Sequence, residues 1–400
     1  MNCSFRLFRS RKIKAVILLL LFIAAFNLSG QQVNKNIING DAQFSSYLPL
    51  LKGQHVGMVV NHTAVVGGGH IVDTLLSCGV QIEKIFAPEH GFRGNADAGA
   101  SVADGKDKKT GVDIISLYGK HKKPTKEMLD SLDIIVFDIQ DVGARFYTYI
   151  STMHYVMEAC AENGVKFIVL DRPNPNGDYF DGPVLQKEFK SFVGMHPIPV
   201  VHGLTVGELA FMINGEGWLK DGVKCQLRVI PVLNYKHSDR VEIPIKPSPN
   251  LPTDLSVRLY PSLCFFEATK ISVGRGTEFP FQVIGYPDNT FGDFTFTPKP
   301  IKGMAMNPPQ KNKTCYGVDL RNRENLNHRF SLKYLLMFRD KFTNDSAMVT
   351  NERWFNLLAG NASLLEDLKA GLNEAEIRKH WAEDLETYGR MRKRYLIYPE

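Results

Sequence analysis

Short apolar runs alternate with segments of helical periodicity between residues 50 and 210. Most of the apolar runs are rich in β-branched residues, which favours buried strands. They predict strands at residues 56–60, 82–87, 113–117, 134–139 and 165–170. Segments with the length of crossover helices lie among them, at residues 71–78, 125–132 and 148–163. This alternation predicts an α/β fold built on a doubly wound, mostly parallel sheet.

The pattern changes after about residue 250. Before that point, Thr205-Val-Gly-Glu208 has the spacing of a capping box, so we expect a further helix to begin at Thr205. Five prolines between residues 244 and 261 interrupt the chain, and the tail from Phe330 onward has the helical patterns of a separate, smaller unit. These features predict one domain at residues 31–255 and a smaller one at residues 256–400.

The first thirty residues have the layout of a secretory signal. Five basic residues and no acid precede an apolar run at residues 15–26, and Ser29 and Gly30 suit a cleavage site. The run is shorter than the roughly 20 residues that span a bilayer, so we expect no membrane span after cleavage. Residues 1–30 therefore predict export, to a periplasm or to the medium, and an uncleaved anchor is the alternative.

Charge and cysteine content argue against several classes of protein. Without the signal the chain has 43 basic and 42 acidic residues, which provides no concentrated basic face for nucleic acid. The five remaining cysteines are scattered and include no Cys-x-x-Cys pair, so they predict neither a disulfide scaffold nor a zinc knuckle. His62, His90 and His202 lie far apart in the sequence, and we expect neither a metal nor another cofactor.

Polar residues follow the predicted strands directly. In a doubly wound sheet ligands bind beyond the carboxyl ends of the strands, so these residues are candidates as a group. They are Asn61-His62-Thr63, Glu89-His90-Gly91-Phe92-Arg93, Gln140 to Tyr147 and Asp171 to Asn176. We expect them to meet at one edge of the sheet.

Glu89 lies in the segment Pro88-Glu89-His90-Gly91-Phe92-Arg93-Gly94. Pro88 and Gly91 predict a sharp turn that holds the carboxyl group in a cleft, where burial would raise its pKa. A carboxylic acid that is protonated near neutral pH can donate a proton to a leaving oxygen. The alternative is that Glu89 forms a salt bridge with Arg93 and only ties the loop.

Charged and aromatic residues also end the strand at residues 134–139. Asp138, Asp141 and Arg145 either bind a ligand or satisfy one another, and Asp138 is a candidate for a buried structural acid. Arg145 is the better ligand candidate, because a guanidinium holds a carboxylate with two parallel hydrogen bonds. Tyr147 either stacks on a sugar or belongs to the core.

Two glycine-rich segments differ in what they predict. Gly67-Gly68-Gly69 lacks the spacing of a phosphate-binding loop, and we expect a flexible turn there. Gly274-Arg275-Gly276-Thr277-Glu278 allows the backbone to approach a ligand closely, while Arg275 and Glu278 supply charge. A tight structural turn is an equal alternative for this second segment.

Taken together, six of these segments give the chain a resemblance to a known family of glycosidases. The segments are Asn61 to Thr63, Pro88 to Gly94, Asp138 to Tyr147, Asp171 to Pro175, His202 to Thr205 and Gly274 to Glu278. Through them the whole mature chain resembles the NamZ-type exo-β-N-acetylmuramidases. The resemblance implies a Rossmann-like domain, a smaller α+β auxiliary domain and a cleft between them. It also implies release of N-acetylmuramic acid from the non-reducing end of peptidoglycan fragments, in cell-wall turnover.

The resemblance marks Glu89 as the catalytic acid. A glycosidase normally uses a second carboxylate, for which Asp141 and Glu278 are candidates unless the acetamido group of the substrate replaces it. Arg93, Arg145 or Arg275 would recognise the lactyl carboxylate of muramic acid. The expected substrate-binding residues are Asn61, His62, His90, Arg93, Gln140, Arg145, Tyr147, Asn174, His202 and Arg275.

Two other functions fit the same residues. The first is a non-catalytic envelope protein that binds peptidoglycan or another glycan in the same cleft. The second is a metal-assisted esterase or deacetylase, whose activity chelation would abolish. The sequence leaves the oligomeric state and the stereochemistry of the reaction open.

Overall fold

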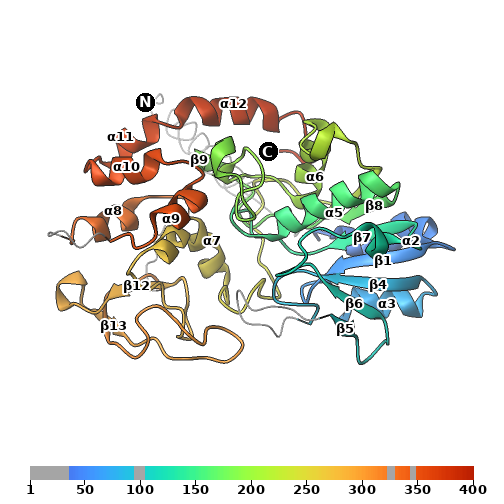
Figure 1. Ribbon diagram of the computed structural model, residues 1–400, viewed down its shortest axis with the longest axis horizontal. Helices are drawn as coiled ribbons and strands as arrows, with labels where there is room; N and C mark the ends of the chain where they lie inside the picture. Colours follow the sequence, from blue (N-terminus) through green and yellow to red (C-terminus); the bar gives the residue numbers. More distant parts are fainter. Residues whose placement is uncertain (1–35, 94–103, 322–328, 343–347) are drawn as a thin grey trace, which may run out of the picture. The chain divides into compact units, whose positions relative to one another are not determined.

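A seven-stranded sheet organises the computed structural model, which describes residues 36–93, 104–321, 329–342 and 348–400 (Figure 1). The strand order is β11-β8-β7-β1-β4-β6-β5, and neighbours are parallel except for β5 and β6 at one edge. The strands are β1 (His55–Val60), β4 (Gln81–Ala87), β5 (Gly105–Lys106), β6 (Asp113–Ser116), β7 (Ile134–Asp138), β8 (Lys166–Leu170) and β11 (Leu227–Ile230). The six parallel strands follow the order 3-2-1-4-5-6 of Rossmann-like folds, which confirms the predicted α/β fold class.

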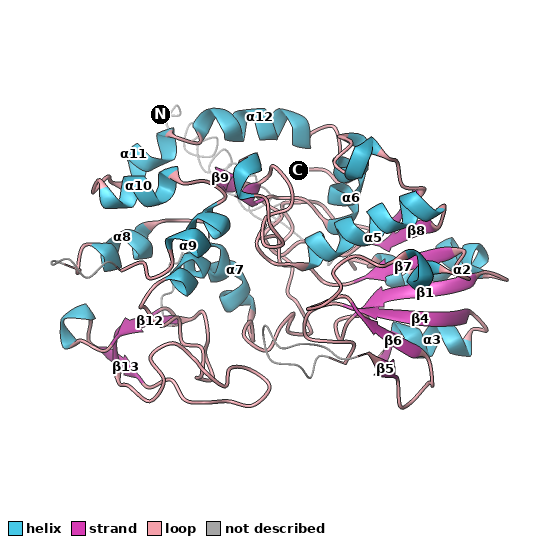
Figure 2. Ribbon diagram, viewed as in Figure 1, coloured by secondary structure: helices cyan, strands magenta, loops and turns pink. Residues whose placement is uncertain are grey.

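Helices cover both faces of this sheet, and Figure 2 shows α3 and α5 on opposite sides of it. In β7, Ile134 and Val136 belong to one apolar cluster, while Ile135 and Phe137 belong to another. A strand that is buried on both faces must be apolar throughout, which explains the Ile-Ile-Val-Phe sequence of β7. The covering helices are α2 (Phe44–Leu51) and α3 (Ile71–Ser77) on one face, and α5 (Tyr149–Asn163) and α6 (Val206–Gly215) on the other.

Local sequence signals set several boundaries in this region. Thr205 caps α6 and forms the predicted capping box with Glu208. The predicted helix at residues 125–132 is only the short α4 (Lys126–Leu129), because Ser131 adopts a φ of 70° that a helix cannot continue through. The predicted glycine turn joins two short strands, β2 (Val65–Val66) and β3 (Gly69–His70).

Two elements of the sheet region were not predicted. Helix α2 contains Pro49, a residue that sequence reasoning takes as a helix breaker. Strand β11 is four residues long and includes Arg228, so it has no continuous apolar run. The charged block at residues 104–110 contributes β5 to the edge of the sheet.

The rest of the chain forms a smaller part with its own antiparallel sheet, as predicted for an α+β unit. Its strands are ordered β12-β14-β13, with bounds Val283–Tyr286, Cys315–Asp319 and Phe294–Phe296 respectively. Its helices are α7 (Asp254–Leu263), the 3-10 helix η4 (Cys264–Ala268), α8 (Lys333–Arg339), α9 (Glu352–Ala359), α10 (Ser363–Lys369), α11 (Glu374–Lys379) and α12 (Ala382–Arg392). A two-stranded ribbon, β9 (Asp181–Val184) with β10 (Pro199–Val201), precedes this part in the chain.

Helix α7 continues through Pro261, although the prolines of this region predicted a break. Proline has no backbone N–H, so the carbonyl of Val257 lacks the usual donor four residues later. The side-chain amide of Asn176 donates to that carbonyl instead, at 3.3 Å, and also donates to the carbonyl of Val142 at 2.8 Å. A residue distant in sequence therefore stabilises the helix at its proline.

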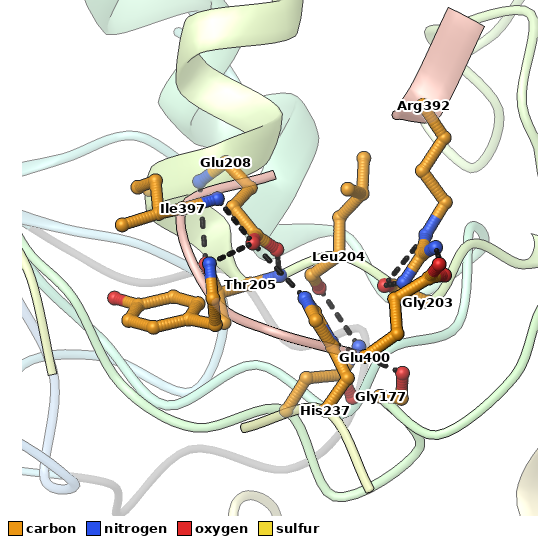
Figure 3. Close-up of polar contacts among 12 residues, drawn as sticks. Gly177, Gly203, Leu204, Thr205, Glu208, His237, Arg392, Ile397 and Glu400 are labelled. Carbon is orange, nitrogen blue, oxygen red and sulfur yellow. Dashed lines mark hydrogen bonds and ion pairs between the residues drawn. The ribbon is translucent and has the colours of Figure 1, made fainter. Parts of the chain in front are cut away.

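The C-terminal segment binds to the start of α6 through buried polar contacts (Figure 3). Glu208 accepts hydrogen bonds from the backbone N–H of Ile397 at 2.9 Å and from the ring of His237 at 3.0 Å. The other ring nitrogen of His237 faces the carbonyl of Gly177 at 3.1 Å. Arg392 donates to the carbonyl of Gly203 at 2.8 Å and 3.0 Å. The last residues of the chain are thus tied to the sheet region.

Residues Ile38–Glu400 form one compact unit, and α7 begins at Asp254 within it. The domain boundary near residue 255 stays a prediction. The predicted signal at residues 1–30 and Gly94 of the Glu89 segment lie outside the described residues. Among the described helices, none combines the length and the apolar character that crossing a bilayer requires.

Candidate active site

A cavity of about 1070 Å³ lies beyond the carboxyl ends of β4, β6 and β7. One wall comes from the loops that follow these strands and includes Glu89, Tyr118 and Thr148. The other wall comes from residues 248–309 together with Trp354. Ligands of doubly wound sheets bind at this end of the strands, so the cavity is where the sequence predicted a site.

Glu89 lines the cavity on a tight turn directly after β4. The backbone N–H of Gly91 donates to the carbonyl of Pro88 at 3.0 Å, and His90 and Gly91 have φ angles of 69° and 76°. A non-glycine residue in the left-handed region is uncommon and often marks a functional turn, which agrees with the predicted sharp turn.

Two hydroxyl side chains accompany the carboxyl group of Glu89. The hydroxyl of Thr148, at the start of α5, donates to its Oε2 atom at 2.9 Å. Burial, together with the negative charge of Glu89, raises the pKa of the Tyr118 phenol above its ordinary value. Tyr118 is therefore a neutral phenol beside this carboxyl group, and the two hydroxyls fix where Glu89 points into the cavity.

Arg93 is engaged away from the cavity, which it does not line. Its guanidinium donates to both carboxylate oxygens of Asp107, at 3.0 Å and 2.9 Å, and lies 4.5 Å from the ring centre of Phe92. Burial tends to raise the pKa of Asp107, but hydrogen bonds from Arg93 and Thr110 outweigh it and hold the pKa below its ordinary value. Arg93 thus joins the Glu89 loop to the edge of the sheet. It does not reach the cavity, so it is not placed to bind the carboxylate of a ligand there.

Arg145 corrects an expectation, because its side chain is completely buried in the protein. Its guanidinium donates to four backbone carbonyls at 2.7–2.8 Å, those of Pro183, Ile198, Leu358 and Ala359. Burial lowers the pKa of Arg145 to about 9. A side chain committed in this way cannot hold a ligand carboxylate, so Arg145 connects the β9 region to the end of α9 instead.

Three amide side chains from the predicted site also serve the loops. Gln140 donates to the carbonyls of Asp141 and Pro173, at 2.9 Å and 2.8 Å. Asn174 donates to the carbonyl of Leu204 at 2.8 Å, and Asn61 accepts from the backbone and hydroxyl of Thr63. All three are buried and none lines the cavity, so their contacts shape the loops that carry it.

Asp141 and His202 form a buried pair that likewise does not line the cavity. Oδ2 of Asp141 accepts from the backbone of Gly143 at 2.7 Å and lies 3.6 Å from Nε2 of His202. His62 is also outside the cavity lining, and its ring contacts the carbonyl of Lys246 at 2.9 Å. Burial lowers the pKa of His62, which favours a neutral ring.

Asp138 is a buried structural acid, as one of the two sequence alternatives proposed. Its partner is Arg172 rather than Arg145, with contacts of 2.6 Å and 3.0 Å. Arg172 also donates to Asp41 at 2.7 Å. This buried ion cluster joins the segment before α2 to the ends of β7 and β8.

Tyr147 belongs to the core, as one of its two alternatives predicted, and it also lines the cavity, while its stacking on a sugar stays a prediction. Its hydroxyl donates to the carbonyl of Pro247 at 2.8 Å, and its ring packs edge-on against Tyr149 and Tyr260. The ring is held rigidly between the two walls, which suits a fixed apolar surface for a ligand.

The second wall carries an ion pair that the sequence only half predicted. Arg275 lines the cavity as expected, but Glu278 is exposed to solvent and does not. The partner of Arg275 is Glu267 of η4, which also lines the cavity. Glu267 is the single charged residue in the run Leu263-Cys-Phe-Phe-Glu-Ala268, and a lone acid in an apolar segment was the signal that could have found it.

Lys122 lines the cavity beside Phe192, so a lysine and an aromatic ring form part of its rim. Lys122 places its ammonium 4.5 Å from the ring centre of Phe192, and Tyr155 stacks on the same ring with an interplanar angle of 12°. The structure gives Lys122 no carboxylate partner within the described ranges.

Family models match the chain along almost its whole described length. The model of the N-terminal domain of the exo-β-N-acetylmuramidase NamZ matches residues 56–255, and that of its C-terminal domain matches residues 258–398. The chain belongs to the NamZ family. A peptidoglycan β-N-acetylmuramidase NamZ from Bacillus subtilis (strain 168) is 38% identical over 378 residues, which cover 90% of each chain.

Two solved structures of DUF1343 family proteins from Bacteroides fragilis NCTC 9343 share this fold. The first is 43% identical, with a TM-score of 0.84, and the match covers 91% of this chain and 99% of that one. The second is 30% identical, with a TM-score of 0.78 and coverage of 91% and 100%. The NamZ fold therefore extends over both the sheet region and the smaller part.

The segments that carry the NamZ resemblance divide into two structural groups. Glu89, His90, Tyr147 and Arg275 line the cavity. The other predicted residues make buried or surface contacts within the loops around it. Most of the motif residues of this chain thus build the frame, and few of them line the cavity.

Proposed function

We propose that this protein is an exo-β-N-acetylmuramidase that releases N-acetylmuramic acid from the non-reducing end of peptidoglycan fragments. Membership of the NamZ family supports this activity. The observation that carries the proposal is the placement of Glu89, which lines the cavity on a constrained turn and accepts a hydrogen bond from Thr148. A glycosidase needs such a fixed carboxyl group beside the scissile bond.

Glu89 acts as the general acid in this proposal. As the bond between the anomeric carbon and the leaving oxygen breaks, Glu89 gives its proton to that oxygen. Thr148 and Tyr118 keep the carboxyl group oriented, and the turn at His90 prevents it from swinging away. The rings of Tyr147 and Phe192 offer apolar surfaces for the sugar face.

Lys122 is the residue we expect to meet the lactyl carboxylate of muramic acid. Three arginines were candidates, but Arg93 is paired with Asp107 and Arg145 with backbone carbonyls. Arg275 lines the cavity but is paired with Glu267, so that pair carries no net charge. Lys122 lies above Phe192 on the rim, and it supplies the positive charge that distinguishes muramic acid from a neutral sugar.

The Glu89→Gln variant tests the assignment of the acid. Glutamine keeps the size of the side chain and its contact with Thr148, but it has no proton to donate to the leaving oxygen. We expect the release of N-acetylmuramic acid from a muramyl disaccharide to fall by about 100- to 10,000-fold, with an unchanged melting temperature. Products are identified by mass.

Glu278→Gln is the matched control, because Glu278 is exposed and does not line the cavity. It should keep the wild-type rate. If Glu89→Gln released the sugar as fast as the wild type, Glu89 would have no part in the mechanism.

We also propose that the protein acts outside the cytoplasm, in the periplasm or after secretion. The basic and apolar pattern of residues 1–30 supports export, and peptidoglycan, the source of the proposed substrate, lies in the cell envelope outside the cytoplasm. Sequencing the N-terminus of the mature protein from its host tests this. A chain that still begins at Met1 and fractionates with the cytoplasm would contradict it.

A further inference from the structure

The cavity of the proposed muramidase contains a second carboxyl group that no motif pointed to. Within the described ranges, Glu89 and Glu267 are the two acidic residues that line it. Asp141 is buried behind the loops and Glu278 is exposed outside, so neither of the acids expected from the sequence faces the cavity.

Arg275 holds Glu267 in one position. Its Nε atom donates to Oε1 of Glu267 at 3.0 Å, and its Nη2 atom donates to the same oxygen. The guanidinium also lies 5.1 Å from the ring centre of Phe281, which fixes it from behind. A planar guanidinium that binds one carboxyl oxygen from two of its nitrogens fixes the orientation of that carboxyl group.

The second oxygen of Glu267 is left for a ligand. Both hydrogen bonds from Arg275 go to Oε1, and among the described residues the structure shows no hydrogen-bond donor for Oε2. A partly buried carboxylate oxygen in a cavity of this volume can accept a proton from a bound water.

The two acids come from different walls. Glu89 follows β4 in the sheet region, whereas Glu267 belongs to η4 in the smaller part. Residues of both walls, including Tyr147 and Tyr260, lie around the same space. A sugar bound there would have one carboxyl group on each side, which is the arrangement that glycoside hydrolysis uses.

We infer that Glu267 is the second catalytic carboxylate and acts as the base, a conclusion that rests on the proposed muramidase activity. A water oxygen forms the new bond to the anomeric carbon from the α face while the β-linked leaving oxygen departs. The water proton passes to Oε2 of Glu267, and the leaving oxygen takes a proton from Glu89. The products are the free sugar and the shortened alcohol, and solvent then restores both acids to their starting forms.

The test removes Glu267 and supplies an anion in its place. The substrate is 4-nitrophenyl β-N-acetylmuramide, whose nitrophenolate leaves without protonation. We expect Glu267→Ala to lower kcat by about 100- to 10,000-fold, and sodium azide to restore turnover while forming an α-configured muramyl azide. Azide has this outcome because it attacks from the face that the missing carboxylate served.

Two comparisons separate this role from a structural one. Glu89→Gln should lose much less activity on the nitrophenyl substrate than on a disaccharide, because only the disaccharide needs the acid. Glu267→Gln serves as the second variant if the alanine variant does not fold, and it should be inactive on both substrates at an unchanged melting temperature.

The inference is overturned if Glu267→Ala keeps kcat within tenfold of the wild type. It is also overturned if azide fails to restore the variant, or if the azide product has the β configuration that participation of the acetamido group would give. A wild type that cleaves no muramide would refute the proposed function itself, whereas an active Glu267 variant refutes only the second carboxylate.

Discussion

Lys122 and Arg275 both bring positive charge to the cavity, but their surroundings give them different tasks. Arg275 has a carboxylate partner in Glu267, and its planar group orients that partner. Lys122 is exposed above an aromatic ring, where a flexible ammonium can follow a charged substituent of the sugar. Recognition of the lactyl group is therefore assigned to Lys122, whereas Arg275 orients Glu267, the carboxylate that activates water.

Replacing Lys122 with methionine should weaken the recognition of muramic acid selectively. Methionine keeps the apolar contact with Phe192 but removes the charge. We expect kcat/KM for a nitrophenyl muramide to fall about tenfold, while the lactyl amide of the same muramide, which has no charge, changes little. Steady-state kinetics of the variant and the wild type compare the loss of kcat/KM on the charged substrate with the loss on the neutral one.

Lys120→Met provides the control, because Lys120 is exposed in the same loop and does not line the cavity. Equal losses of Lys122→Met on the charged and the neutral substrate would contradict the assignment. If Arg275→Met, rather than Lys122→Met, lost more activity on the charged substrate than on the neutral one, Arg275 would be the residue that recognises the lactyl carboxylate.

At the scale of elements, the hydrophobic pattern predicted what is regular and missed what depends on distant contacts. The strands at 56–60 and 134–139 were found because both faces of the sheet are covered. Helix α7 was not, because its proline depends on an amide from Asn176, about eighty residues earlier in the chain. The turn of Glu89 was predictable from Pro88 and Gly91 alone.

The candidate site shows the same limit. Residue types after the strands predicted where the site is, but not which way a side chain points. Arg145 and Asn174 are directed into the frame by carbonyls that belong to other segments, and no local pattern records those carbonyls. Glu267 reaches the cavity because the fold brings η4 against the loop of Arg275, a contact between segments that no local pattern records.

Asp171 accepts hydrogen bonds from the start of α6, and its titration should make the stability of the protein depend on pH. Burial raises the pKa of Asp171 to about 6, although hydrogen bonds from Tyr398, Thr205 and Gly207 oppose the shift. Between the ordinary value of 3.8 and this value, the folded chain keeps a proton that the unfolded chain has released. The contribution of this group to stability therefore falls as the pH rises through that window.

We expect the free energy of unfolding of the wild type, relative to Asp171→Asn, to decrease by about 3 kcal/mol at most from pH 4 to pH 7. Asparagine does not titrate, so the difference between the two proteins isolates the group. Urea unfolding at several pH values measures it, and Asp130→Asn at an exposed site supplies the background. A difference that stays constant, or that grows with pH, would contradict the shift.

For the whole molecule, the main consequence of the fold is that both of its parts supply the cavity. The sheet region provides Glu89 and the rim lysine, and the smaller part provides Glu267 and Arg275. The C-terminal segment ties the end of the chain back to α6. Family membership extends over both parts, which agrees with a site that needs both.

In the proposed function the enzyme cleaves the bond at the anomeric carbon of a terminal muramic acid residue. Hydrolysis of a defined muramyl disaccharide in ¹⁸O-labelled water, followed by mass spectrometry of the products, tests it most directly. We expect one heavy oxygen in the released N-acetylmuramic acid and none in the remaining sugar. Label in the remaining sugar, or an intact disaccharide after incubation with the wild-type protein, would contradict it.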